Sequence, residues 1–324
     1  MNGMATRRIP AATRAAMGRR RGGRPINGWV ILDKPLGLSS SQAVGAVRRI
    51  TGAAKAGHGG TLDPLATGVL PIALGEATKT VAWAMAGLKI YRFCLRWGEA
   101  RTTDDAEGAV TATSATRPDA AAIVAILPRF TGTILQAPPA YSAIKVGGQR
   151  AYKLARAGAK VAPPPRLVEI VALRLVGQPD ADHAELEMVT GKGAYVRALG
   201  RDLALALGTL AYVSALRRLA VGPFTLERAI SLDNLAALDH SAAAFGHLLP
   251  IETALDDIPA LALTEAEAHR LRHGQSVVPL LAADRALIDE LGTGAMVRAT
   301  TGQALVALAE IVAGGLRPVR VINP

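Results

Sequence analysis

A glycine-rich stretch in the first quarter of the chain holds the side chains best suited to chemistry. It reads KAGHGGTLDPLATG over residues 55–68, with the imidazole of His58 and, five residues later, the carboxylate of Asp63. Pro64 keeps Asp63 out of a helix interior, and the glycines let a ligand approach the backbone closely. The G-K-[ST] element of a Walker loop is missing. The stretch can present a catalytic carboxylate, but Asp-Pro is also common in ordinary turns, so spacing alone leaves both interpretations open.

A second candidate is the sequence GKGAYVR over residues 191–197, where a glycine turn leads into a predicted helix. Such a turn presents free backbone N–H groups and the positive end of a helix dipole. Arg197 can hold a catalytic carboxylate ionised and oriented, because the guanidinium fork matches a carboxylate. A solvated arginine at an ordinary helix N-terminus explains the pattern equally well. Tyr91 lies in a strand predicted over 89–97, where a tyrosine is more often a core residue than a catalytic one.

Metal sites and nucleophilic serine sites find little support in the sequence. His269 and His273 are four residues apart on a predicted helix, but the glutamate of a zinc protease is absent between them and two arginines are interleaved. Cys94 is the single cysteine, and no G-x-S-x-G sequence is present. We therefore predict no metal and no cofactor, which leaves an aspartate, an arginine, a tyrosine and a histidine as candidate actors.

A succession of short elements must position these side chains. An apolar run at 29–32 ends in a turn-prone segment, and Ser40 or Ser41 can cap the helix that follows. Strand-like sequence is found at 89–97, 109–113 and 184–190, helical sequence at 119–127 and about 194–207, and a loop or strand pair at 211–230.

Two further segments differ from the rest in composition. Residues 136–166 are basic and bracketed by prolines and glycines, which predicts a protruding loop with a short helix. Beyond residue 250, Thr264 and Glu267 form a capping box that predicts a helix. Strand-like runs follow around 295–300, 304–312 and 316–322, so we expect a small β-rich appended domain over 251–324.

Length and composition limit the class of protein. The chain has 324 residues, half of them apolar, which is enough to bury a large core without disulfides and excludes a disordered chain. The lone Cys94 and the lack of an export signal favour a reducing, cytoplasmic setting. No uninterrupted apolar run is long enough for a membrane span, which needs about 18 residues.

The net charge of +11 is unevenly distributed. Residues 1–26 contain seven arginines and no acid, which predicts a disordered basic arm; an Arg-rich transit peptide is the alternative, although the arm lacks serine. Residues 27–200 contribute +7, whereas residues 251–324 carry −3. The excess suggests a polyanionic partner for the arm and the first two thirds of the body.

Ordered blocks of the sequence resemble the TruB family of tRNA pseudouridine synthases. The blocks are GWVILDKP at 28–35, GHGGTLDPLATGVLP at 57–71, Tyr91, DDAEG at 104–108, QAPPAYSAIK at 136–145, GKGAYVR at 191–197 and LRR at 216–218. The resemblance covers residues 28 to about 230 and continues more weakly through the C-terminus. So many blocks in the same order make the resemblance specific.

The resemblance implies a fold, a reaction and a partner. The fold is α+β: a pseudouridine-synthase domain over 27–250, with a central mixed, largely antiparallel sheet flanked by helices and loops. It also has a thumb-like insertion at about 136–166 and a small PUA-like RNA-binding domain over 251–324. The reaction is isomerisation of uridine to pseudouridine in the T loop of tRNA, at the position conventionally numbered 55, without cofactor or metal. The implied partner is the tRNA T stem-loop, bound by a cytoplasmic monomer with no membrane or protein partner.

The resemblance also implies roles for single residues. Asp63 matches the nucleophilic carboxylate, and the sequence leaves open whether it attacks the sugar or the base. Arg197 matches the arginine that pairs with this aspartate, and Tyr91 the tyrosine that stacks on the flipped base and takes part in proton transfer. His58 matches the histidine that fills the space vacated by the base.

Further matches concern the lining of the pocket and its support. Tyr195 and Leu216 match residues that line the base pocket, and Lys34 and Asp105 are candidate supporting residues. The chain departs from the family where T-x-T-x-D is common: Arg101 replaces the first threonine, which questions the hydrogen bonding of that loop but keeps Asp105.

Two other functions compete with an RNA-modifying enzyme. The basic body and the appended domain are also compatible with an RNA-binding or RNA-folding module whose main contribution is not chemical. A metal-dependent nuclease is disfavoured, because no paired carboxylates lie near Asp63 in the sequence.

Overall fold

The structure, a computed structural model, describes residues 23–142, 144–159, 161–238 and 246–323. The predicted basic arm lies outside the described residues up to position 22. The residues that follow belong to the fold: the Arg24 N–H donates to the Gly52 carbonyl at 2.7 Å, and Ile26 is buried. No helix of the described ranges is long and apolar enough to cross a membrane.

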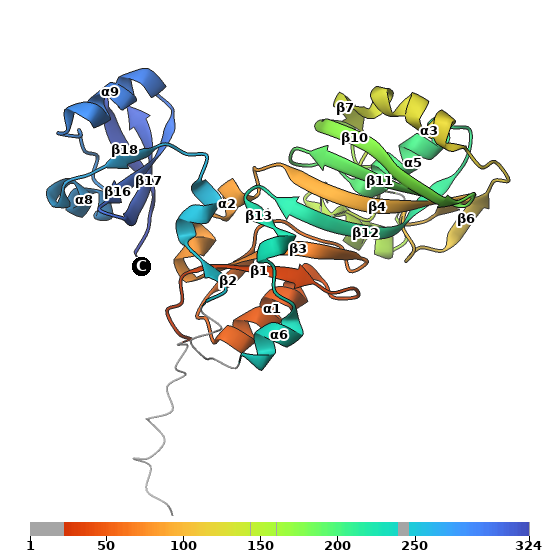
Figure 1. The fold of residues 1–324 in the computed structure, drawn as a ribbon, viewed down its shortest axis with the longest axis horizontal. Helices are drawn as coiled ribbons and strands as arrows, with labels where there is room; N and C mark the ends of the chain where they lie inside the picture. Colours follow the sequence, from red (N-terminus) through yellow and green to blue (C-terminus); the bar gives the residue numbers. More distant parts are fainter. Residues whose placement is uncertain (1–22, 143, 160, 239–245, 324) are drawn as a thin grey trace, which may run out of the picture.

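A ten-stranded sheet organises the larger part of the molecule (Figure 1). Its strands follow the order β14-β1-β3-β12-β4-β11-β10-β7, with β2 beside β3 and β13 beside β12. Their bounds are β1 (Gly28–Lys34), β2 (Ala56–His58), β3 (Ala66–Leu74), β4 (Lys89–Trp97), β7 (Gly132–Gln136), β10 (Arg166–Asp180), β11 (His183–Thr190), β12 (Ala211–Val221), β13 (Phe224–Thr225) and β14 (Leu248–Leu249). Within this sheet β12 runs parallel to β3 and the other described pairs are antiparallel. The predicted mixed, largely antiparallel sheet is confirmed.

Both faces of this sheet are covered, as its sequence requires. Successive side chains of a strand point to opposite faces, so Val30 and Leu32 enter one apolar core while Trp29 and Ile31 enter another. The first core is closed by α1, α3, α5 and α6, and the second by α2, η5 and part of β17. Helices in this part are α1 (Ser40–Thr51), α2 (Val81–Ala84), α3 (Ala120–Ile126), α4 (Ala151–Arg156), α5 (Val196–Ala206) and α6 (Leu232–Ala237), with short 3-10 helices η2 (Gly75–Lys79), η3 (Leu127–Phe130), η4 (Leu226–Arg228) and η5 (Ile251–Leu255).

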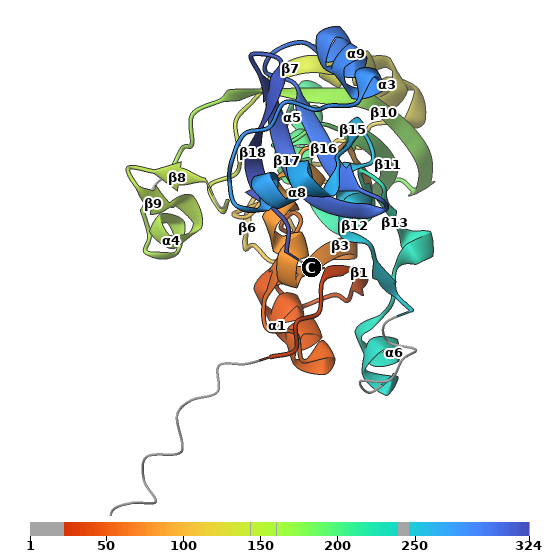
Figure 2. The ribbon, with the colours of Figure 1, turned by 90° about the vertical axis from the view of Figure 1, so that its left-hand side faces the viewer.

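Two hairpins stand outside the central sheet. The hairpin of β5 (Glu99–Arg101) and β6 (Val110–Thr113) encloses the loop that carries Asp105. The hairpin of β8 (Lys145–Val146) and β9 (Gln149–Arg150), together with α4, protrudes from the body (Figure 2). This protrusion is the segment predicted as a basic insertion.

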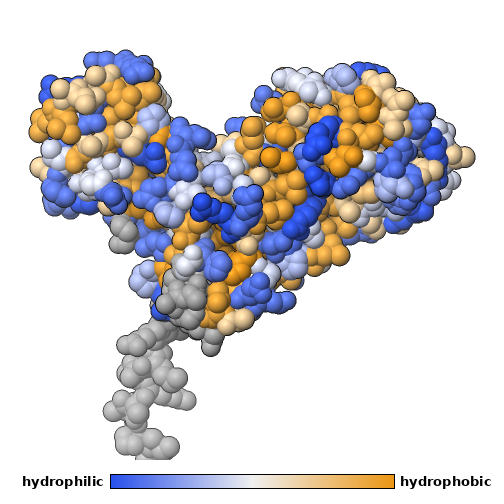
Figure 3. Space-filling model, in the orientation of Figure 1, coloured by the Kyte–Doolittle hydropathy of each residue, from blue (hydrophilic) through white to orange (hydrophobic). Residues whose placement is uncertain are grey.

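The C-terminal part forms a small β-rich domain with its own core. Its sheet has the order β15-β16-β17-β18, with bounds β15 (Ala260–Ala262), β16 (Met296–Thr301), β17 (Ala304–Val312) and β18 (Gly315–Val321), and with helices α8 (Glu265–Arg272) and α9 (Ala282–Leu291). The predicted capping box is present, since Thr264 and Glu267 exchange hydrogen bonds at the start of α8. The surface between this domain and the end of the central sheet near β7 is concave (Figure 3).

Some local predictions were wrong. The N-cap of α1 is Ser39, whose hydroxyl accepts the Gln42 N–H, because Ser40 already lies in the helix. Of the two alternatives predicted for 211–230, the strand pair is present, since the long strand β12 pairs with the short antiparallel strand β13. Helix α9 was not predicted at all.

Candidate active site

A cavity of about 280 Å³ opens between the loop that carries Asp63, the start of β4, the turn before α5, and β12. Five of the eight residues singled out from the sequence line it: Asp63, Tyr91, Tyr195, Arg197 and Leu216. They come from four separate stretches of chain. The structure therefore brings these five together at one opening.

Arg197 is the centre of this site. It is 5% exposed, and its Nη2 lies 2.8 Å from Asp63 Oδ2, while its Nε lies 3.5 Å from Asp105 Oδ2. The same guanidinium donates to the carbonyls of Thr103 and Tyr141, each at 2.9 Å. Charge-assisted bonds of this kind fix both partners. Arg197 is held on several sides and in turn orients the half-exposed carboxylate of Asp63.

Asp105 supports this arrangement from behind. It is buried, accepts the Glu107 N–H at 3.0 Å and the Thr103 hydroxyl, and does not line the cavity. Arg101 keeps the loop closed, because it donates to the Ala106 carbonyl at 3.1 Å and stacks over the Tyr212 ring at 4.1 Å. Arg101, the residue that departs from the family sequence, therefore contributes contacts of its own to this loop.

The backbone of the loop from Gly60 to Pro64 is held at every carbonyl. Arg218 accounts for the first two, donating to Gly60 O at 3.1 Å and Thr61 O at 3.4 Å. The Ser40 hydroxyl donates to Leu62 O at 2.8 Å, and the Ala66 N–H donates to Asp63 O at 3.0 Å. The Gly37 N–H and Lys34 Nζ donate to Pro64 O at 2.9 and 3.4 Å. Asp63 therefore projects from a rigid support.

Lys34 contacts the loop of Asp63 through the Pro64 carbonyl and does not line the cavity. Its ammonium is fully buried and also donates to the carbonyls of Pro35 at 2.9 Å and Leu38 at 2.6 Å. Burial lowers the pKa of Lys34 to about 8, and the negative charge of Asp63 partly opposes this shift. Lys34 is thus protonated at neutral pH, where it joins the end of β1 to the loop.

We expect Ser40→Ala to loosen this loop. The Ser40 hydroxyl also accepts the Leu62 N–H at 2.7 Å, so the substitution leaves two buried backbone groups without partners. The expected cost is about 1–3 kcal/mol in the free energy of unfolding, together with a lower kcat. Urea unfolding and single-turnover assays would measure both. Ser39→Ala, which removes only the helix cap, should cost about 1 kcal/mol and leave kcat unchanged; equal kcat in the two variants would contradict the prediction.

Tyr91, Leu216 and Tyr195 form the walls of the cavity. Tyr91 and Leu216 lie on the neighbouring strands β4 and β12, and Leu216 is almost buried. Tyr195 precedes α5, and its backbone is fixed by the side chain of Gln136, which accepts the Tyr195 N–H at 2.8 Å and donates to its carbonyl at 3.2 Å. Two aromatic rings and an aliphatic side chain suit a planar, apolar-faced ligand such as a base.

His58 is not among the residues that line the cavity. It ends the short strand β2, and its Nδ1 is buried without a hydrogen-bond partner among the described residues. Burial, followed by the positive charge of Arg218, lowers the pKa of His58 below its usual value, so the imidazole is neutral at pH 7. The structure therefore places His58 beside the loop of Asp63 rather than inside the opening.

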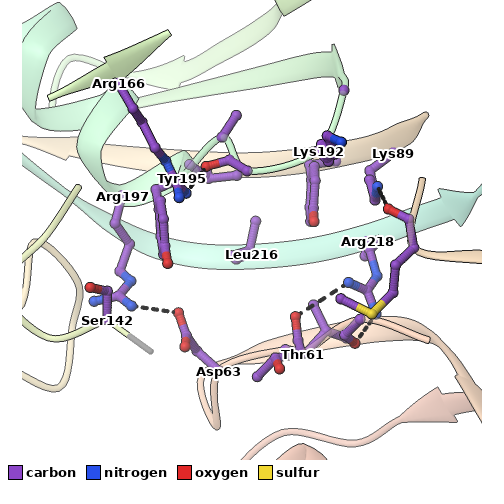
Figure 4. A pocket seen from close by; sticks show the side chains of 18 residues that line it. Thr61, Asp63, Lys89, Ser142, Arg166, Lys192, Tyr195, Arg197, Leu216 and Arg218 are labelled. Atoms are coloured by element: carbon purple, nitrogen blue, oxygen red, sulfur yellow. Dashed lines mark hydrogen bonds and ion pairs between the residues drawn. The ribbon is translucent and has the colours of Figure 1, made fainter. Parts of the chain in front are cut away.

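Other cavity residues were not assigned to the site from the sequence. They include Lys89, Ser142, Arg166 and Arg218 (Figure 4). Ser142 is buried, and its hydroxyl has no partner within the described part of the chain. Arg166 lies over the Tyr195 ring at 5.3 Å. Ser142 and Arg218 lie in two of the blocks that carry the family resemblance, and Lys89 lies two residues before Tyr91 on the same strand, but none of these signals assigned them a role.

Comparison with known proteins now defines the family. The signature described as TruB family pseudouridylate synthase (N terminal domain) matches residues 48–196, and that of the tRNA pseudouridylate synthase B C-terminal domain matches residues 197–256. A protein of Rhodospirillum rubrum named tRNA pseudouridine synthase B is 56% identical over 95% of this chain and 100% of its own length. A namesake from Bradyrhizobium diazoefficiens is 55% identical over 94% of this chain and 88% of its own. The chain belongs to the TruB family of pseudouridine synthases.

Solved structures agree on the fold of this TruB family member. An H/ACA ribonucleoprotein chain bound to a substrate RNA containing 2′-deoxyuridine superposes with a TM-score of 0.69 at 22% identity, covering 92% of this chain and 85% of that one. A chain of an archaeal box H/ACA complex gives 0.69 at 24% identity, covering 92% and 86%. The expected pseudouridine-synthase fold is confirmed.

Proposed function

We propose that this chain converts uridine to pseudouridine in the T loop of tRNA, at the position conventionally numbered 55, with Asp63 as the nucleophile. Membership of the TruB family makes the chain an isomerase that acts on uridine in tRNA. The observation that supports the finer statement is the ion pair of Asp63 and Arg197 at the mouth of an aromatic cavity. Arg197 holds the carboxylate in a fixed orientation at the opening.

The target base must leave its stack to reach Asp63. Flipping a base costs a few kcal/mol, which contacts in a fitted pocket offset. Tyr91 offers a ring on which the uracil can stack, and Leu216 an aliphatic surface on the adjacent strand. His58, neutral and beside the loop, is proposed to occupy the space that the base leaves.

The chemistry can follow two routes from this geometry. In one, an Asp63 oxygen bonds to C1′ of the ribose while the C1′–N1 electron pair leaves with the base. In the other, the oxygen adds to C6 of the base before that bond breaks. In both, the freed base turns, C5 bonds to C1′, and the carboxylate is released. The C5 proton is then lost while N1 gains a proton, so the product is an isomer of the substrate.

The rest of the molecule is proposed to bind the tRNA. The protruding insertion includes the basic residues Lys145, Lys153 and Arg156, and the segment 136–166 contains no acidic residue. Cationic side chains on a projecting element suit phosphate contacts and recognition of RNA shape. We propose the small C-terminal domain as a second RNA contact, and a cytoplasmic monomer without a protein partner as the active form.

The direct test is incubation with unmodified tRNA followed by mapping of pseudouridine by position. A single modified site in the T loop is the expected result, without added metal or cofactor. Pseudouridine at another position, or in several stem-loops, would contradict the proposed specificity. A sedimentation measurement on the protein–tRNA complex would test the monomer.

We also expect the arginine-rich arm to strengthen tRNA binding. The deletion should stop at residue 22, because Ile26 is part of the core. It removes six arginines, so tRNA affinity should fall several-fold at low salt. The slope of log affinity against log salt concentration should decrease in magnitude by at least about one, because fewer phosphates are neutralised. Filter binding at several salt concentrations measures this slope, and an unchanged slope would exclude an RNA contact by the arm.

A further inference from the structure

One end of the cavity holds cations that lack a carboxylate partner. Asp63 and Arg197 lie at the opposite end from Lys89, Lys192 and Arg218 (Figure 4). Lys89 is 8% exposed and Arg218 only 1%. Within the described part of the chain, none of these three cations forms an ion pair, and Asp63 is the single carboxylate that lines the cavity.

The ammonium of Lys89 is fixed but not saturated. Its Nζ donates to the carbonyls of Met85 and Gly87, each at 2.6 Å. An ammonium group has three donors, so one N–H of Lys89 has no acceptor among the described residues. Arg218 is oriented by the carbonyls of Val69, Gly60 and Thr61 and contributes a second fixed positive charge.

Keeping these charges together without a counter-ion is unfavourable. Burial, with further contributions from the charges of Arg218 and Lys192, lowers the pKa of Lys89 to about 8. No carboxylate faces Lys89 from β11, β12 or α2 within the described residues to oppose this shift. The ammonium is nevertheless retained at pH 7. Such a costly arrangement in a cavity suits an anion that is present only during the reaction.

The reaction itself supplies that anion on either route. If Asp63 attacks C1′, the electron pair of the C1′–N1 bond stays on the uracil, which becomes an anion spread over N1 and the carbonyl oxygens. If Asp63 adds to C6, the displaced pair moves through C5 to O4. The negative charge therefore develops on the pyrimidine ring in both cases, and no external oxidant or reductant is needed.

We propose that Lys89, with Arg218 behind it, donates a hydrogen bond to the uracil ring and stabilises the negative charge that the ring acquires during the reaction, on cleavage of its bond to the ribose or on addition of Asp63 to C6. This inference rests on the proposed function. It makes Lys89 a catalytic residue at the far end of the pocket from the nucleophile. Preorganised donors aimed at a developing charge lower a barrier without reorganisation during the reaction.

The test is the Lys89→Met substitution, assayed in single turnover with saturating enzyme. One tRNA carries uridine at the target position and a second carries 5-fluorouridine, and the loss of the N-linked nucleoside is followed in digests. The rate with uridine should fall on the order of 10²–10³-fold, with tRNA affinity within about twofold of wild type. Fluorine withdraws electrons and stabilises a ring anion by itself, so the loss with 5-fluorouridine should be at least tenfold smaller.

Three results would overturn the inference. Equal losses with the two substrates would indicate a positioning role without charge stabilisation. Weaker tRNA binding at an unchanged rate, with a salt slope reduced by about one, would indicate a phosphate contact instead. An unchanged rate would remove Lys89 from the reaction altogether. Wild-type protein and Asp63→Asn are assayed on the same tRNA, so absence of T-loop pseudouridine with wild type is recognised as failure of the proposed function.

A chemical rescue experiment distinguishes loss of the positive charge at position 89 from damage to the folded structure. Cys94 is the single cysteine, so a Cys94→Ala, Lys89→Cys chain carries one thiol, which 2-bromoethylamine converts to a lysine-like cation. Aminoethylation should restore the rate at least tenfold over the untreated thiol. Alkylation with iodoacetamide, which adds bulk without charge, should not. Equal rates after the two treatments would count against the proposal even if Lys89→Met did not fold.

Discussion

Asp63→Asn is expected to abolish pseudouridine formation while tRNA binding stays within a few-fold of wild type. The amide is nearly isosteric, so the loop keeps its backbone contacts with Arg218, Ser40 and Lys34. The amide oxygen, however, is neutral and a poor nucleophile. Loss of a covalent nucleophile lowers rates on the order of 10⁴-fold or more. The measurement is single-turnover conversion of unmodified tRNA, with binding followed separately.

The same variant distinguishes the enzyme from an RNA-folding module. If the main contribution of the protein were to unfold and refold tRNA, Asp63→Asn would fully rescue the defects of cells that lack it. If the contribution is chemical, rescue fails although the tRNA is still bound. Asp33→Asn is a useful control, because Asp33 is also paired with an arginine, Arg217, at 2.8 Å, yet does not line the cavity. Its rate should stay within a few-fold of wild type, and undiminished activity of Asp63→Asn would remove Asp63 from its role.

Local sequence signals were sufficient for much of the fold. The apolar pattern predicted β4 and β11, because a half-buried strand alternates side chains between two faces. The capping box predicted α8, because its two residues lie three positions apart in the sequence. For β12 the sequence left a loop and a strand pair as alternatives, because Ser214, Arg217 and Arg218 interrupt its apolar pattern. Their polar groups are satisfied only by distant partners, such as Asp33 for Arg217. A pattern read along the chain cannot show such partners.

The candidate active site could be predicted less completely than the fold. Asp63 and Arg197 are far apart in the sequence, so their spacing left a turn and a helix end as equal alternatives; the family resemblance, not the spacing, joined them. Lys89 and Arg218 looked like ordinary charged residues of a strand. Burial without a carboxylate partner distinguishes them, and that property exists only once four segments of chain have been brought together.

Arg197→Met is expected to have the second large effect, on stability as well as on rate. The substitution leaves the carboxylate of Asp105, which is 2% exposed, without its cation. Removing one partner of a buried ion pair costs about 3–5 kcal/mol. Asp63 also loses the contact that orients it, so the rate should fall on the order of 10²–10³-fold. Urea unfolding and single-turnover conversion of tRNA measure the two losses separately.

The double variant Arg197→Met, Asp105→Asn separates these two consequences. Neutralising Asp105 removes the uncompensated buried charge, so most of the lost stability should return. Activity should not return, because Asp63 still lacks its partner. Arg174→Met is the control for loss of an arginine: Arg174 pairs with Glu187 on the surface, where such a contact is worth about 0–1 kcal/mol, and the rate should not change. Recovery of the rate in the double variant would mean that Arg197 serves the fold alone, whereas stability restored without activity assigns its contact with Asp63 to catalysis.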